Sequence, residues 1–321
     1  MQRMRRTRGA AFLALVLAVA LGGAACDSGK KDGGGEKGGG EKRPAAVGGI
    51  PTAAGTHKQK LDVGTFGHRE YLLHMPAKVA KGKWKGGKPA DPPPAVIALH
   101  GGLANMQQMR SLTGFDGLSD DKGFLAVYPD GFMTTWNAGG CCGASKIGKI
   151  DDVGFLSKLI DKLTGSGLVD PDRVYVAGFS NGAGMAYRLA CEKPGKVAAI
   201  GVVEGALATK CDPGRPVSAM IFHGTADRSV PINGGGRMDV NDSSPFPPAA
   251  KAVEFWRKAA GLPEPKRKVE ALTARTSCTA TGKGNGGAEV AYCKIQGGTH
   301  KWPDEASTML WRFFADHPRA S

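Results

Sequence analysis

Short apolar runs alternate along this chain with longer segments in which apolar residues recur at helical spacing. The apolar runs predict strands at 69–75, 95–99, 124–128, 174–177, 198–203, 219–222 and 289–295. The helical spacing predicts helices at 152–163, 181–191, 249–260 and 305–315. The run at 95–99 is apolar at every position, as strands covered on both faces are. The alternation therefore predicts an α/β domain whose mainly parallel sheet has helices on both faces.

Residues 178–182 read Gly-Phe-Ser-Asn-Gly and join a predicted strand to a predicted helix. A G-x-S-x-G pentapeptide at such a junction is typical of the sharp turn that presents a serine hydroxyl as a nucleophile above an α/β sheet. The alternative is a glycine-rich turn whose serine has no chemical role. The pentapeptide alone is weak, so the rest of the chain decides between the two.

A nucleophilic serine needs a histidine base, and the base needs a carboxylate that orients it. In sheets of this kind the order along the chain is serine, acid, histidine. Asp227 lies just beyond the apolar run at 219–222, where a carboxyl-end loop is expected, so we predict it as the acid. Glu204 and Asp212 are weaker candidates because each follows the preceding strand. The alternative for Asp227 is a turn or capping residue.

Of the seven histidines, His300 and His317 follow all of these acid candidates. His317 lies past the last predicted helix, where we expect an exposed tail. His300 lies in a loop between the last predicted strand and the last predicted helix, at a carboxyl end. We therefore predict His300 as the base.

The negative charge that develops during attack on a carbonyl needs N–H donors. One expected donor is the backbone N–H of Asn181, directly after the serine. The second should come from the loop His100-Gly101-Gly102-Leu103, and we favour Gly102 and Leu103 over Gly101. His100 and His223 are expected to hold loops through side-chain hydrogen bonds rather than to take part in the chemistry.

Several motifs occur together and in a fixed order along the chain. They are H-G-G at 100–102, Y-P-D-G at 128–131, W-N at 136–137, C-C at 141–142, D-D-V-G-F at 151–155, G-F-S-N-G at 178–182, H-G-T-A-D at 223–227 and G-G-T-H-K-W-P at 297–303. Over about residues 61–316 the chain thereby resembles the extracellular polyhydroxybutyrate depolymerase and feruloyl esterase group, near carbohydrate esterase family 1. It departs from the usual pattern at Thr299, where a third glycine is usual, and at Ile232, where an aromatic residue is usual.

The resemblance implies the α/β-hydrolase fold and a secreted serine esterase with Ser180, Asp227 and His300 as triad. Its substrates would be hydroxybutyrate or hydroxyalkanoate oligomers, or feruloyl or acetyl esters of plant polysaccharide, with no cofactor and no metal. Trp136 and Trp302 are candidates for the walls of the substrate cleft, because ester pockets are apolar and aromatic. The alternative for each tryptophan is a loop anchor.

Two other functions remain open. One is a serine exopeptidase-like hydrolase, which normally needs an extra domain to select peptides. The other is a lipoprotein that uses the fold as a ligand-binding or adhesion module. A binding module does not need a nucleophile, an acid, a base and an oxyanion loop, so this function does not explain why the four occur together.

The first 25 residues have the features of a targeting segment. Arginines at positions 3, 5, 6 and 8 precede an apolar stretch at 10–21 that is too short to span a bilayer. Small residues at 23–25 precede Cys26, as in a bacterial lipobox, whose cysteine becomes the lipidated N-terminus. The alternative is an ordinary secretory signal cleaved near Ala25. Either reading predicts export, as a membrane-anchored lipoprotein or as a secreted protein.

The segment after Cys26 consists largely of Gly, Lys and Glu up to about Ile50. It has too little apolar surface to offset the entropy of ordering, so we expect a flexible tether. The predicted organisation is a signal peptide at 1–25, a lipidated cysteine and tether at 26–52, and a catalytic domain at 53–321.

The formal charge of +14 includes the four arginines of the targeting segment, which leaves +10 for the mature chain. Lysines at 78, 81, 83, 85 and 88 surround Trp84, either as a solvated insertion or as a dock for anionic lipid or acidic polysaccharide. No nucleic-acid recognition motif is present, so we expect no such partner. The expected partners are an ester substrate and, through the anchor, a membrane, and the expected state is a monomer.

Six cysteines follow Cys26, an even number that suits an oxidising compartment. We predict three pairs: Cys278 with Cys293 across a Gly-rich turn, Cys191 with Cys211, and a vicinal bridge between Cys141 and Cys142. No spacing matches a zinc site, so we interpret these cysteines as structural.

Overall fold

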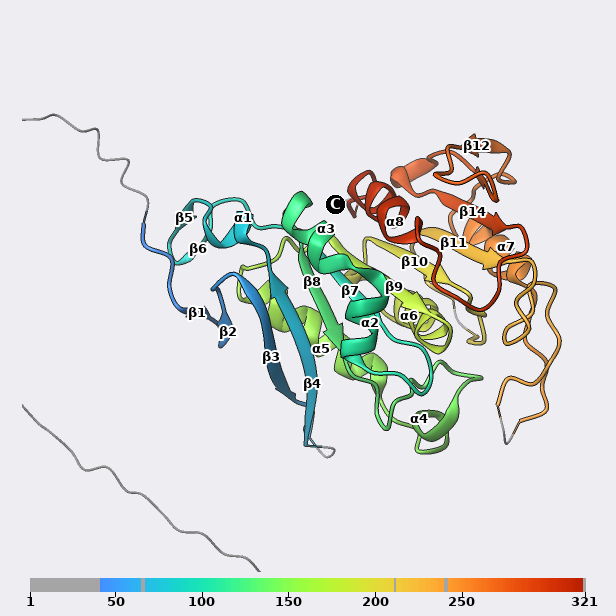
Figure 1. The fold of residues 1–321 in the computed structure, drawn as a ribbon, viewed down its shortest axis with the longest axis horizontal. Helices are drawn as coiled ribbons and strands as arrows, with labels where there is room; N and C mark the ends of the chain where they lie inside the picture. The colour runs from blue at the N-terminus through green and yellow to red at the C-terminus, as the bar shows by residue number, and fades with distance from the viewer. Residues whose placement is uncertain (1–40, 65–66, 211, 240–241, 320–321) are drawn as a thin grey trace, which may run out of the picture. The chain divides into compact units, whose positions relative to one another are not determined.

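The structure is a computed structural model that describes residues 41–64, 67–210, 212–239 and 242–319. The chain from Gly40 onward forms one compact unit, with a large sheet between helices (Figure 1). The predicted targeting segment, Cys26 and most of the predicted tether lie outside the described residues. In the described part, no helix is both long and apolar enough to cross a membrane.

The large sheet has ten strands in the order β12-β13-β14-β11-β10-β9-β7-β8-β4-β3. Its six central strands are parallel: β8 (Leu125–Pro129), β7 (Ala95–Leu99), β9 (Val174–Phe179), β10 (Ala199–Val203), β11 (Ser218–Gly224) and β14 (Val290–Ile295). Two antiparallel strands flank each edge: β4 (His68–Met75) with β3 (Gly55–Asp62), and β13 (Thr276–Ala280) with β12 (Arg267–Val269). The prediction of a mainly parallel sheet is confirmed.

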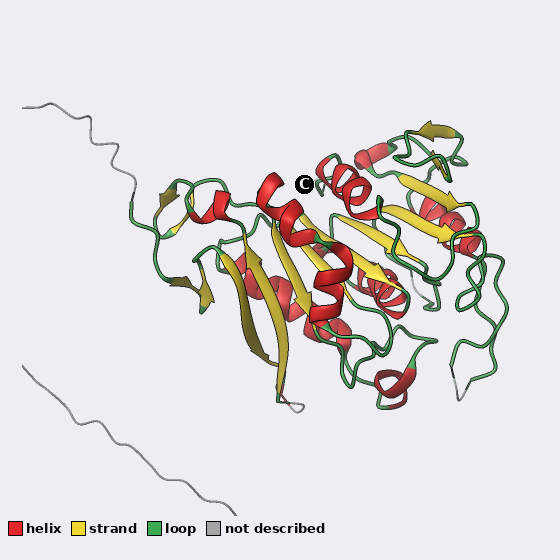
Figure 2. Cartoon of the chain, viewed as in Figure 1, coloured by secondary structure: helices red, strands yellow, loops and turns green. Residues whose placement is uncertain are grey.

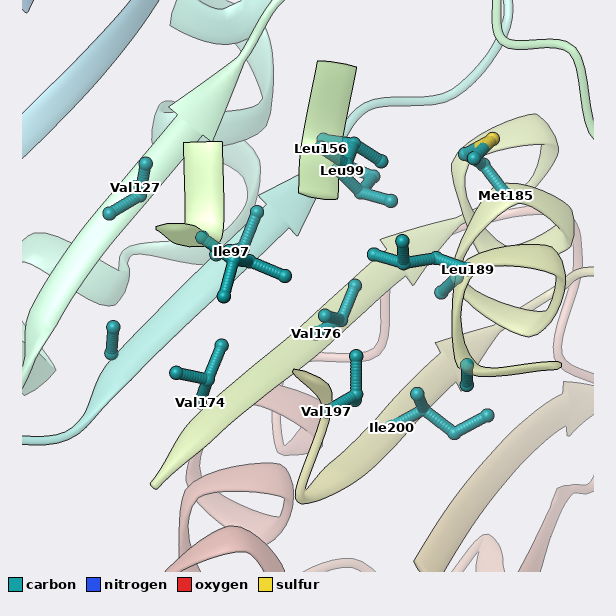
Figure 3. Packing of buried hydrophobic residues seen from close by; sticks show 14 of the residues in the cluster. Ile97, Leu99, Val127, Leu156, Val174, Val176, Met185, Leu189, Val197 and Ile200 are labelled. Carbon is teal, nitrogen blue, oxygen red and sulfur yellow. The ribbon is translucent and has the colours of Figure 1, made fainter. Parts of the chain in front are cut away.

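Helices cover both faces of this sheet (Figure 2). One face packs against α2 (Met106–Thr113), α3 (Phe115–Lys122) and α8 (Ala306–Ala315), and the other against α5 (Asp152–Gly165), α6 (Asn181–Glu192) and α7 (Ala249–Ala259). Figure 3 shows Val176 and Ile200 of the sheet facing Leu189 of α6. Because both faces are covered, every residue of β7 is buried, which explains its uninterrupted apolar run.

The helices α2 and α3 were not predicted from the sequence pattern. Each has only eight residues, too few for a clear apolar periodicity. A local signal is nevertheless present at the start of α2. The Asn105 side chain accepts a hydrogen bond from the Gln108 N–H, and the Gln108 side chain accepts one from the Asn105 N–H. This reciprocal capping box is readable as N-x-x-Q.

The folded region begins earlier than the predicted tether boundary at residue 52. The strands β1 (Ala46–Val47) and β2 (Ile50–Pro51) form a hairpin around Gly48 and Gly49, both with positive φ. Ile50 is fully buried and belongs to the main core. Two apolar residues on either side of a Gly-Gly turn are enough to join this segment to the domain, so the prediction of tether character up to residue 52 is wrong.

Smaller elements complete the described fold: α1 (Ala77–Ala80), a hairpin of β5 (Trp84–Lys85) and β6 (Lys88–Pro89), α4 (Gly143–Ile147), and 3₁₀ turns at Pro194–Lys196 and Asn285–Gly287. The pair Cys278–Cys293 joins opposite positions of β13 and β14, so this predicted pair is confirmed. The sulfurs of Cys141 and Cys142 are in contact, and the vicinal bridge stays a prediction. Cys191 is also disulfide-bonded, while Cys211 lies outside the described residues.

Candidate active site

The site lies at the switch point of the parallel sheet, where the strands that follow β7 along the chain are added on opposite sides of it. From β7 the chain passes to β8 on one side, whereas β9 lies on the other side of β7. The loops that leave β7 and β9 therefore diverge and expose a crevice at the carboxyl ends of the strands. The predicted oxyanion loop follows β7, and the predicted nucleophile follows β9 (Figure 1).

Ser180 occupies a sharp turn between β9 and α6. Its backbone has φ 53° and ψ −117°, a conformation that costs a non-glycine residue free energy. The turn is tight because a Cβ on Gly178 would clash with the carbonyl of Gly182, and one on Gly182 would clash with the carbonyls of Leu99 and His100. The two glycines of the pentapeptide thus permit the approach that lifts the serine hydroxyl to the edge of the sheet.

The structure brings Ser180, His300 and Asp227 together. His300 Nε2 lies 2.9 Å from Ser180 Oγ, and His300 Nδ1 lies 2.8 Å from Asp227 Oδ2. The other oxygen of Asp227 accepts hydrogen bonds from the N–H groups of Ser229 and Val230, at 2.8 and 3.0 Å. With Nδ1–H directed at the carboxylate, Nε2 of His300 is free to accept the serine proton.

The loops that carry Asp227 and His300 are hydrogen-bonded to each other. The Ala226 N–H donates to the Gly298 carbonyl at 2.8 Å, and the Gly297 N–H donates to Thr225 Oγ1 at 2.9 Å. A Cβ on Gly224 would clash with the Gly298 carbonyl, so glycine is needed for this approach. These contacts fix the distance between acid and base.

Glu204, a weaker acid candidate in the sequence, lies beside Asp227 rather than in its place. It follows β10 with φ 53° and is fully buried. Its two carboxyl oxygens lie 2.9 and 3.0 Å from the Gly224 N–H, and it is hydrogen-bonded to Asp227. Burial, followed by the hydrogen bond with Asp227, raises the pKa of Glu204 to about 9. Glu204 therefore keeps its proton at neutral pH and donates it to the Asp227 carboxylate.

Asp227 remains ionised beside this protonated neighbour. Burial alone would raise its pKa, but hydrogen bonds from His300, Glu204 and the Val230 N–H lower the pKa to about 2. Asp227 thus carries the negative charge that an imidazolium at His300 needs.

Two of the predicted oxyanion donors, Asn181 and Gly102, belong to segments that approach each other closely. Asn181 begins α6, and a Cβ on Gly102 would lie 3.7 Å from Asn181 Cβ, so the loop after β7 approaches the helix start closely. The Leu103 N–H, in contrast, donates to the Thr134 carbonyl at 2.9 Å. Leu103 is therefore corrected as a candidate donor, and Asn181 and Gly102 remain.

A buried network behind Asn181 was not predicted. The Asn181 side chain accepts from the Trp136 N–H at 2.7 Å and donates to the Trp136 carbonyl at 2.9 Å. The adjacent Asn137 N–H donates to Asp152, whose other oxygen pairs with Arg69 at 3.0 Å. Within the D-D-V-G-F motif, Asp151 caps the start of α5, whereas Asp152 fixes the loop that holds Asn181.

The two predicted cleft tryptophans are both largely buried. Trp136 is fully buried, and its indole N–H donates to the His100 carbonyl at 2.9 Å. Trp302 is 7% exposed, and its indole N–H donates to Ser307 at 3.1 Å. Trp136 is a loop anchor, so the prediction that it lines the substrate cleft is corrected. Trp302 lines a pocket beside the loop that carries His300, so its place in the cleft stays a prediction. An aromatic residue in a loop motif does not show which way its ring points.

Three further histidines, His100, His223 and His317, have structural contacts. His100 is bonded to the Gly101 carbonyl at 2.7 Å and accepts from the Gly131 N–H at 2.8 Å, and His223 donates to the Val230 carbonyl at 2.8 Å. Both hold loops, as expected, and burial lowers the pKa of each. His317 is buried rather than exposed, and it contacts Glu289 at 3.2 Å.

In the described residues, one group of three acidic or histidine side chains could share a metal ion. It comprises Glu204, Asp227 and His300, whose ligand atoms lie within 4.8 Å of one another. Both nitrogens of His300 are already engaged by Asp227 and Ser180, and Glu204 is engaged by Gly224 and Asp227. This hydrogen-bonding pattern is that of a proton-transfer site.

Comparisons with known proteins agree with this geometry. The family described as "Esterase PHB depolymerase" matches residues 85–250. "Putative esterase NocK" of Nocardia uniformis subsp. tsuyamanensis is 28% identical over 306 residues, which are 90% of this chain and 88% of that protein. Feruloyl esterase B of Piromyces equi is 32% identical over 238 residues, and the match spans 68% of this chain and 41% of that protein.

Solved structures show the same fold. The acetyl xylan esterase from Aspergillus awamori superposes with a TM-score of 0.56 at 16% identity, over 80% of this chain and 99% of that one. The α/β-hydrolase fold predicted from the motifs is thereby confirmed. From the fold and the family match, we conclude that this chain is a carboxylic-ester hydrolase that belongs to the PHB depolymerase family of esterases.

Proposed function

We propose that the protein hydrolyses carboxylic esters through an acyl-enzyme formed on Ser180. His300 Nε2 removes the hydroxyl proton as Ser180 Oγ attacks the ester carbonyl carbon. His300 then gives this proton to the leaving alcohol, and the acyl group stays on the serine. In the second half, His300 activates a water that releases the carboxylic acid. The observation that carries the proposal is the pair of hydrogen bonds that links Ser180, His300 and Asp227 in a line.

The N–H groups of Asn181 and Gly102 are proposed to bind the carbonyl oxygen as it becomes negative. Asn181 opens α6, so the positive end of the helix dipole adds to the stabilisation. Loss of one such donor typically costs about 3 kcal/mol in activation free energy. The network from Asn181 through Trp136 and Asp152 to Arg69 supports the donor in position before the substrate arrives.

The substrate class is proposed from the relatives. Esters of feruloyl or acetyl groups on polysaccharide, or hydroxyalkanoate oligomers, match the names of the family and of the similar proteins. Export is proposed from the targeting segment, and the disulfide Cys278–Cys293 supports an oxidising compartment. A lipid on Cys26 would hold the domain at a membrane. Palmitate labelling in cells should mark the wild type but not Cys26→Ser.

The mechanism is tested with purified mature protein, p-nitrophenyl acetate and p-nitrophenyl butyrate. Ser180→Ala should lower kcat by at least about 10³-fold, because the nucleophile is lost and only binding and the oxyanion donors remain. Ser111→Ala, at an exposed serine on α2, is the matched control and should keep wild-type kcat. Turnover by Ser180→Ala at the wild-type rate would refute the acyl-enzyme mechanism.

A further inference from the structure

A small apolar cavity adjoins the nucleophile. Its walls come from α6, from the loop after β8, from the loop after β10 and from the segment that follows Asp227. The lining residues are Ala138, Cys141, Cys142, Ser180, Asn181, Gly184, Ala206, Ala208, Val230 and Phe246. Cys141, Ala206, Val230 and Phe246 also form a buried apolar cluster of their own. The cavity is therefore an apolar chamber that contacts both Ser180 and the residue that provides an oxyanion donor.

The position of His300 decides which part of an ester this cavity receives. His300 must reach the leaving alcohol oxygen to protonate it, so the alcohol lies on the His300 side of the serine. Asn181 lines the cavity and His300 does not. The acyl chain, which points away from the leaving group, is thus directed into the cavity. Two large apolar side chains, Leu103 and Met133, are 87% and 68% exposed. Their loops are joined by the hydrogen bond that the Leu103 N–H donates to the Thr134 carbonyl.

The volume of the cavity limits the acyl chain. It measures about 40 Å³. A single water needs at least about 10–15 Å³, so the cavity is only a few times larger than the smallest one that admits a water and suits a short aliphatic group. Acetyl and butyryl groups carry one and three carbons beyond the carbonyl carbon and fit. A feruloyl group carries a substituted aromatic ring beyond a two-carbon link and does not fit.

The walls of the cavity are held in place by contacts outside it. The Cys142 N–H donates to the Trp136 carbonyl at 3.2 Å, and the neighbouring Gly143 N–H donates to Asp239 at 3.0 Å. The sulfurs of Cys141 and Cys142 are in contact within the same wall. A Cβ on Gly184 would lie 3.1 Å from Ala138 Cβ, so helix and loop already meet closely. The chamber therefore has little freedom to widen around a longer chain.

We propose that this cavity is the acyl pocket and that it restricts the enzyme to esters of short-chain acids, from acetyl to about butyryl, on large or small alcohols. This inference rests on the proposed function, because it assumes an acyl group on Ser180. It assigns the vicinal cysteine pair, Val230 and Phe246 as the residues that set acyl length. Among the ester classes named by the relatives, it favours acetyl esters over feruloyl esters.

The test is a series of p-nitrophenyl esters of two, four, six and eight acyl carbons, with methyl ferulate in parallel. The wild type should show at least a tenfold fall in kcat/KM between the four- and eight-carbon esters, because a methylene without room in a filled pocket typically costs about tenfold or more. Phe246→Ala should raise kcat/KM for the six- and eight-carbon esters relative to acetate. Phe255→Ala, which truncates a phenylalanine that packs on α7 against Trp256 and does not line the cavity, should keep the wild-type order.

The outcomes separate the pocket from the mechanism. Equal kcat/KM across the series, or faster turnover of methyl ferulate than of the acetyl ester, would overturn the pocket while leaving the esterase intact. No turnover of any ester by a folded protein would instead refute the proposed function. If Phe246→Ala does not fold, Val230→Ala enlarges the same cavity by a smaller amount and should shift the preference in the same direction. An unchanged order in a folded variant would also overturn the proposal.

Discussion

Asp152 and Glu204 are both fully buried acids next to the active site, and they are neutralised in different ways. Asp152 faces the Arg69 guanidinium at 3.0 Å, which counters the effect of burial on its pKa. Glu204 has no lysine or arginine in ion-pair contact within the described chain, and its neighbour is the Asp227 carboxylate. Glu204 is neutralised by its own bound proton, whereas Asp152 is neutralised by a cation. The comparison indicates that the Asp152 side of the site is a fixed support, whereas the Glu204 side responds to pH.

The largest expected effect concerns the ion pair. Arg69→Ala leaves the Asp152 charge buried without a partner, which should lower the free energy of unfolding by about 3–5 kcal/mol. Chemical denaturation at neutral pH measures this loss. The matched control is Lys58→Ala, which removes an exposed partner 2.7 Å from Glu70 and should cost less than about 1 kcal/mol. A loss of similar size in both variants would show that Arg69 does not neutralise a buried charge.

A smaller effect is expected on catalysis at the other acid. Glu204→Ala removes the hydrogen bond to Asp227, which should lower kcat about tenfold with little change in KM, since Glu204 does not touch the substrate. Glu204→Gln keeps a donor for Asp227 and an acceptor for the Gly224 N–H, so it should recover most of this loss. Steady-state kinetics with p-nitrophenyl acetate tests both. If Gln and Ala are equally slow, the donated hydrogen bond is not what Glu204 supplies.

The smallest expected effect is on the pH dependence of stability. Unfolded Glu204 ionises near its ordinary pKa of 4.5, whereas the folded group keeps its proton up to about 9. The folded state binds the extra proton between these values, so this group's contribution to stability falls as pH rises through that range. Glu204→Gln should therefore gain stability relative to the wild type between pH 5 and 8, by at least about 1 kcal/mol.

The opposite sign applies to Asp227, which separates the two acids in the same experiment. Its folded pKa of about 2 lies below the ordinary 3.8, so its contribution is present above pH 4 and is lost as pH falls toward 2. Denaturant unfolding of the wild type and of Glu204→Gln from pH 3 to pH 9 measures both trends. A difference between the two proteins that does not change with pH would contradict a protonated Glu204.

The arrangement of the triad could be predicted because it depends on order along the chain and on the ends of strands. Ser180, Asp227 and His300 each follow a central parallel strand, and such ends meet at one edge of the sheet. The central strands were equally predictable, since burial on both faces leaves an uninterrupted apolar run.

The supports of the site were not predictable in this way. Arg69 pairs with Asp152 across 83 positions of the chain, and no local pattern marks either residue as a partner. The sequence shows which strand Glu204 follows, but it does not show that Glu204 contacts Asp227. Ile50 and Leu103 show the same limit. Ile50 is buried in the main core, and the Leu103 N–H is hydrogen-bonded to the Thr134 carbonyl. Both contacts are with segments that are distant in the sequence.

The central claim, a covalent acyl-enzyme on Ser180, is tested most directly by trapping that residue. The protein is incubated with a fluorophosphonate, which reacts with activated serines, and is then analysed by intact mass and peptide mapping. We predict one adduct per molecule, located on Ser180, with loss of ester hydrolysis in proportion to labelling and no adduct on Ser180→Ala. An adduct on another residue, or full activity after Ser180 is completely labelled, would contradict the account.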